Sequence, residues 1–131
     1  MAMLLAVMQK QLGLSFAKHD AYLSVVGGLK ITEPGSDVAV CAALTSSLRD
    51  IAIPDDIIAI GEVGLAGELR SVAGLELRLA EAARLGFRRA VIPATDQHKF
   101  DAPLEIIGAP NLFLALAQLG LRQSTQVQSA A

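Results

Sequence analysis

Serine and lysine side chains of this chain could together supply a nucleophile and its base. A serine hydroxyl attacks an amide only when a base lies within hydrogen-bond distance. The candidate serines are Ser36, Ser46 and Ser47, and the candidate lysines are Lys10, Lys18, Lys30 and Lys99. Spacing alone pairs none of these groups, and partners can be distant in sequence, so a Ser–Lys pair stays open at this point.

Other reactive side chains favour structural roles. His19 and His98 stand alone, without an HExxH pattern or paired cysteines, so we expect no metal site. Cys41 is the single cysteine and lies in the apolar run VAVCAAL, which indicates a buried structural thiol and excludes an intrachain disulfide. Asp55 and Asp56 directly follow a proline, which is more typical of a turn than of an acid–base pair.

Glycine-rich segments of this chain do not form a phosphate site. No GxxxxGK[ST] loop is present, so the chain should not hydrolyse nucleotides by itself. Gly61, Gly64 and Gly67 recur in the segment GEVGLAG, whose spacing differs from the dinucleotide-binding pattern GxGxxG. Glycines that bend a hairpin explain this segment better.

The overall charge gives no electrostatic footprint for nucleic acid, because the net charge is -2 and the pI is near 5.6. Arg84, Arg88 and Arg89 form the one notable basic cluster, and Lys30 is a further weak candidate for contact with DNA. Charges near a helix C-terminus explain the arginines better than DNA binding does, because cations are favourable there. DNA contact remains the alternative interpretation.

Length and composition indicate one domain. The chain has 131 residues, of which 53% are hydrophobic and 18% are charged, so a sizeable core can form. The mean hydropathy of +0.48 is high, which predicts either an alanine-rich surface or apolar surface covered by a partner. The apolar opening MAMLLAVM is too short for a membrane span and lacks the features of a signal peptide, so we expect no membrane association. The composition fits a reducing, cytoplasmic setting.

Helical and strand-forming segments alternate, which predicts an α/β or α+β fold with a mixed sheet. We expect one domain over 1–121 and a disordered tail over 122–131. The predicted helices cover 2–13, a segment that Ser36 or Asp37 caps and whose apolar positions reach Leu48, 75–85 ending at Gly86, and 111–119 with Asn111 as a cap. The predicted strands cover 22–26, 57–65 with a glycine bend, 67–72 as the return arm of a hairpin, 89–93, and a segment around 106–107.

Two blocks carry a family resemblance: VGGLKITEP at 26–34 and GEVGLAGELRSVAGLELRLAEAARLGFRRAVIP at 61–93. They resemble the C-terminal Lon-protease-like domain of the RadA (Sms) family of bacterial DNA-repair proteins, and the likeness extends over residues 2–121. The long block is highly specific and is closer to the RadA family than to Lon itself. The resemblance implies a single fold like the Lon proteolytic domain, with a mixed sheet and packed helices.

The resemblance also bears on catalysis. Lon proteases carry a nucleophilic serine in a Gly-Pro-Ser-Ala-Gly motif before a helix, and a lysine in a later Gly-Gly-Leu-Lys segment. The alignment places Gly35 on the serine and Glu76 on the lysine, so both members of the dyad are replaced. The GGLK that ends at Lys30 precedes the serine position, and Ser36 stands one residue late, a rotation of about 100° on a helix. The resemblance therefore implies a non-proteolytic domain.

The family resemblance implies that this domain is a structural scaffold. RadA-like proteins have an N-terminal zinc finger and a RecA-like ATPase domain, so ATP, Mg and Zn are expected in those domains and no cofactor is expected in this chain. The domain is expected to help form a hexameric ring in an assembly that acts on DNA. Two other functions stay open: an active serine peptidase with an unconventional dyad of Ser36 and Lys30, and a partner-recruiting module without DNA contact.

Overall fold

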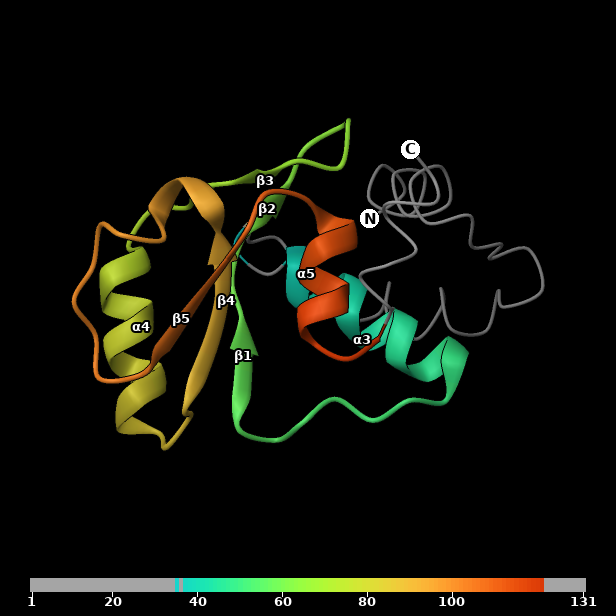
Figure 1. Cartoon of the computed structure of the whole chain (residues 1–131), viewed down its shortest axis with the longest axis horizontal. Helices are drawn as coiled ribbons and strands as arrows, with labels where there is room; N and C mark the ends of the chain where they lie inside the picture. The colour runs from blue at the N-terminus through green and yellow to red at the C-terminus, as the bar shows by residue number, and fades with distance from the viewer. Residues whose placement is uncertain (1–34, 36, 122–131) are drawn as a thin grey trace.

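The computed structural model describes residues 35 and 37–121 of the chain. The helix predicted over 2–13, the strand over 22–26 and the tail over 122–131 lie outside the described residues. Figure 1 shows a sheet seen nearly edge-on, with α4 on one side of it and α3 and α5 on the other. The described helices and strands are α3 (Asp37–Arg49), β1 (Ile57–Ala59), β2 (Glu62–Val63), β3 (Leu69–Arg70), α4 (Leu75–Arg84), β4 (Arg89–Pro93), β5 (Glu105–Ala109) and α5 (Leu112–Gln118), with a 3₁₀ turn at Ala94–Asp96.

A three-stranded parallel sheet in the order β1-β4-β5 forms the centre of the described part. Its middle strand β4 is buried from Ala90 to Pro93, so the strand is a continuous apolar run. Alternate side chains of β4 serve two cores because successive residues of a strand point to opposite faces. Val91 belongs to the cluster that α3 and α5 cover, whereas Ala90 and Ile92 belong to the cluster around Leu79 of α4.

The segment predicted as a single strand over 57–65 is divided at Gly61. β1 pairs with β4 in parallel, while β2 pairs with β3 in a separate antiparallel hairpin. The division follows from a change of partner, because the backbone of Gly61 accepts a bond from Val38 and donates one to Gly35 at the start of α3. The hairpin return arm is confirmed, and the fold class is also confirmed because parallel and antiparallel pairing both occur beside packed helices.

The helix ends follow local sequence signals. α4 ends at Arg84, Leu85 caps it, and Gly86 adopts the left-handed conformation with φ 98° that glycine tolerates best. Asn111 caps α5, because its side chain accepts a hydrogen bond from the Leu114 backbone N–H at 2.8 Å. Cys41 is fully buried in α3, as its apolar surroundings predict.

Candidate functional site

Gly35 occupies the position at which the resemblance places the nucleophile, and the side chain of Arg78 covers it. A Cβ atom built on Gly35 would lie 2.9 Å from Arg78 Nη1 and 3.1 Å from its Cζ. The Arg78 Nε donates to the Ala73 carbonyl oxygen at 3.3 Å, so the guanidinium is held from the loop before α4. A guanidinium stays protonated in proteins and cannot act as a general base. The charged group next to position 35 therefore cannot accept the proton of a nucleophile.

Glu76, the counterpart of the Lon lysine, lies in the first turn of α4 and is exposed. A carboxylate is favourable there because the positive end of the helix dipole is near. The residues near Gly35 across the groove are Leu77 and Arg78, and Glu76 does not line that groove. The structure thus does not bring Gly35 and Glu76 together into a reactive pair. Ser36 and Lys30, the alternative dyad, lie outside the described residues.

A groove of about 480 Å³ lies between the start of α3, the strand β1 and the helix α4. Most of its lining is aliphatic, and the polar groups at its rim are Arg78 and Glu81. Glu81 is already paired, since its carboxylate accepts from Arg84 Nε at 2.9 Å. The groove offers an apolar surface with few polar groups, and the described residues place no hydroxyl or amine in it.

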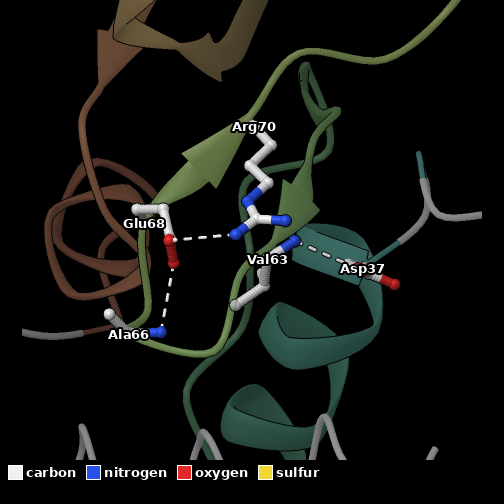
Figure 2. Close-up of polar contacts among 5 residues, drawn as sticks. All are labelled: Asp37, Val63, Ala66, Glu68 and Arg70. Carbon is white, nitrogen blue, oxygen red and sulfur yellow. Dashed lines mark hydrogen bonds and ion pairs between the residues drawn. The ribbon is translucent and has the colours of Figure 1, made fainter.

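The start of α3 is fixed to the hairpin by Asp37. Its carboxylate accepts a hydrogen bond from the Val63 backbone N–H at 3.0 Å, as Figure 2 shows. Partial burial raises the pKa of Asp37, an effect that the bond from Val63 opposes. The sequence predicts Ser36 or Asp37 as the local helix cap, whereas the Asp37 carboxylate bonds to the backbone of β2. This bond therefore positions Gly35 and the hairpin relative to each other.

Figure 2 also shows how Glu68 orders the hairpin turn. Its carboxylate accepts from the Ala66 backbone N–H at 3.1 Å and lies 3.6 Å from Arg70 Nη2. A Cβ atom on Gly64 would overlap the Glu68 carboxylate, so a larger residue at position 64 would displace this carboxylate from the turn. The glycine-rich segment GEVGLAG thus builds a hairpin, as the sequence predicts.

Two of the three arginines of the basic cluster are paired with carboxylates. Arg84 bonds to Glu81 on the same helix, and Arg89 Nη2 lies 2.7 Å from the Asp56 carboxylate. Arg88 is exposed and has no ion pair among residues 35 and 37–121. The structure therefore leaves Arg88 as the described member of the cluster with an uncompensated charge, while Lys30 lies outside the described residues.

The Asp56–Arg89 ion pair should make the stability of the fold depend on pH. The hydrogen bond from Arg89 lowers the pKa of Asp56, so the pair stabilises the fold above the ordinary aspartate pKa, and this contribution is lost as the pH falls through the lowered value. Arg89→Gln should return the pKa of Asp56 toward its usual range, as measured by NMR titration of the carboxyl carbon. Arg88→Gln is the matched control and should move it much less, and equal shifts in both variants would contradict the assignment.

The described residues contain no group of three His, Cys, Asp or Glu side chains that could hold a metal ion. His98 is exposed. In this part of the chain no helix has both the length and the apolar character needed to cross a bilayer.

Sequence comparisons place these features in a family. A family model of the Lon protease (S16) C-terminal proteolytic domain matches residues 7–113. The chain is 46% identical over 119 residues to the DNA repair protein RadA of Escherichia coli, which covers 89% of this chain and 26% of that protein. It is 44% identical over 113 residues to RadA of Synechocystis, with 86% and 22% covered, and 44% identical over 117 residues to RadA of Bacillus subtilis, with 88% and 26% covered.

The chain thus spans about a quarter of the length of these curated relatives, and the match covers most of its own residues. Both findings agree with the resemblance that the two sequence blocks indicate. The described helices and strands lie largely within the matched range. The chain belongs to the family of Lon protease (S16) C-terminal proteolytic domains, in a form similar to the corresponding part of the bacterial DNA repair protein RadA.

Proposed function

We propose that this chain is a non-proteolytic scaffold and oligomerisation domain of a RadA-like DNA repair and recombination ATPase. The observation that carries the proposal is the close approach of the Arg78 guanidinium to Gly35. Position 35 has no side chain that could attack an amide, and the group beside it cannot remove a proton. The similarity to RadA supports the repair context.

A proteolysis assay tests the non-proteolytic part of the proposal. The chain is incubated with casein, alone and as the Ser36→Ala variant, next to an active Lon protease as positive control. We expect no cleavage above background by either form. Cleavage that disappears in Ser36→Ala would contradict the proposal and would favour the dyad of Ser36 and Lys30.

Ring formation is tested by light scattering across a range of protein concentrations. Leu77, which is 77% exposed, and Leu85, which is 61% exposed, line the same apolar groove and support an apolar contact between copies, because grouped exposed apolar side chains often mark interfaces. A mass near that of six protomers would show that the domain assembles without further domains. A strict monomer both here and in the full-length protein would overturn the oligomerisation role.

Non-specific DNA contact rests on Arg88. Reversing an exposed cation that contacts a phosphate lowers affinity, and it lowers the slope of log K against log salt by about 1. We therefore expect Arg88→Glu in the full-length protein to weaken DNA binding and to flatten that slope. Arg84→Glu is the matched control, since Arg84 is already paired with Glu81. An unchanged slope in Arg88→Glu would remove DNA contact from the proposal.

The remaining parts of the assembly would lie in the rest of a longer protein. ATP, Mg and Zn would bind to domains other than this one, because the chain has no phosphate loop and a single cysteine. The partners of this domain would be other copies of the same protein and, through the assembly, DNA in the cytoplasm. Removing ATP or Zn should then leave the fold of this chain unchanged.

A further inference from the structure

The hairpin formed by β2 and β3 ends in a turn that presents a leucine to solvent. The Gly67 N–H donates to the Gly64 carbonyl oxygen at 2.9 Å, which closes a turn with Leu65 and Ala66 at its centre. Turns usually place glycine, proline, asparagine, aspartate or serine at such positions. This turn instead places Leu65 there, with its side chain 67% exposed. Because turn formation does not require a leucine, its position points to a contact outside the hairpin.

Hydrogen bonds around the turn hold this leucine in place. The Gly64 N–H donates to the Glu68 carbonyl oxygen at 2.8 Å, and the Glu68 carboxylate accepts from the Ala66 N–H at 3.1 Å. Figure 2 shows the guanidinium of Arg70 beside the same carboxylate. A segment that is already held in one conformation loses little freedom when it binds. The ordered turn is therefore suited to docking.

The groove between the start of α3, the strand β1 and the helix α4 has the complementary form. Its volume is about 480 Å³, and two of the residues that line it, Leu77 and Leu85, are exposed leucines on and just after α4. None of the described residues that line the groove comes from the hairpin, and Figure 1 shows the turn projecting away from α4. Leu65 therefore lies outside the groove of its own copy, whereas the turn of a second copy can enter it.

The charges beside the turn and the groove are also complementary. The hairpin segment over 61–72 carries two glutamates and one arginine, so negative charge is in excess there. The rim of the groove carries Arg78 and Glu81, and Arg84 is bonded to Glu81, so positive charge is in excess on this side. Surfaces of opposite charge attract each other and set the orientation in which they meet.

We propose that the hairpin turn of one copy docks in the groove of the next copy, with Leu65 against Leu77 and Leu85. The turn and the groove are different surfaces, so the contact repeats from copy to copy and builds a ring when the rotation between copies closes. This inference rests on the proposed oligomerisation function, and it names the two surfaces that carry the contact.

Disulfide trapping tests which surfaces meet. Leu65→Cys and Leu85→Cys are prepared as separate proteins, mixed and mildly oxidised, with the buried Cys41 left in place. We expect several times more covalent dimer in the mixture than in either variant alone, with positions 65 and 85 joined in the linked peptide seen by mass spectrometry. Ser47→Cys mixed with Leu85→Cys is the matched control, because Ser47 is exposed on α3 and does not line the groove. Equal dimer yields in the two mixtures, or links of 65 to 65 or 85 to 85, would overturn the proposal.

Light scattering separates this inference from the proposed function. We expect Leu65→Ser to weaken self-association by about tenfold or more, because the variant loses the burial of a leucine side chain. Leu65→Met keeps an apolar side chain and should assemble like the parent chain. Assembly that is unchanged in Leu65→Ser would overturn the docking contact and would leave the oligomerisation role standing. A parent that is a strict monomer, both as this chain and in the full-length protein, would overturn both.

Discussion

Leu116→Ala is expected to lower the free energy of unfolding by about 2–5 kcal/mol. Leu116 is fully buried in α5, in the cluster that α5 forms with α3 and the sheet. Truncation removes apolar contacts and leaves a cavity that this packed layer can only partly close. Because a domain of this kind has a total stability of about 5–15 kcal/mol, the variant should lose a large fraction of it.

Urea unfolding followed by circular dichroism measures this loss, which should appear as a lower midpoint with an unchanged slope. Leu77→Ala is the matched control: it makes the same chemical change on α4, where the side chain is 77% exposed. That variant should stay within about 0.5 kcal/mol of the parent chain. Equal losses in Leu116→Ala and Leu77→Ala would contradict the assignment of the core to the α3–α5 layer.

Signals that act over a few residues predict their elements closely. The strand over 89–93 has the bounds of β4, and the helix from Leu75 ends next to Gly86 as predicted. Asn111 caps α5 as its residue type indicates. Each of these features depends on local preferences, because a cap bonds to the next turn and a C-terminal glycine adopts its own backbone conformation.

Features that depend on distant partners were not predictable in this way. The division of the strand over 57–65 results from bonds between Gly61 and the start of α3. Arg89 pairs with Asp56, and no local pattern identifies that partner. Asp96 is 1% exposed although its segment TDQHK is polar, because the fold buries the end of β4.

In the candidate site, too, the aligned positions could be predicted from the sequence and the distant contact could not. Aligned sequence blocks place Gly35 and Glu76 at the positions of the Lon dyad, and Glu76 is indeed an exposed carboxylate. The contact that changes the chemistry, Arg78 over Gly35, comes from a residue that the sequence does not single out. One signal was available: Arg78 stands three residues after the buried Leu75, so a helical period places it on the side of α4 that faces the sheet.

The second large effect is expected on the labelling rate of the Cys41 thiol. Its side chain is 0% exposed, and burial raises the pKa of the thiol far above its usual range, with the nearby Asp37 carboxylate acting in the same direction. The thiolate is the reactive form, so the folded chain should keep this thiol inert. We expect labelling with a disulfide reagent at neutral pH to be slower in the folded chain than in urea by a factor on the order of 10³ or more.

The control places a cysteine on the exposed side of the same helix. In Cys41→Ala/Ser47→Cys the thiol is accessible, and its labelling rate should approach that of the unfolded chain. Labelling of Cys41 as fast as this control would show that α3 does not close over its thiol. Because Cys41 and Leu116 belong to one cluster, Leu116→Ala should speed the labelling of Cys41 by the factor that its lost unfolding free energy predicts. A thiol that reacts only through opening of the core cannot serve as a nucleophile, so the same measurement excludes thiol catalysis at Cys41.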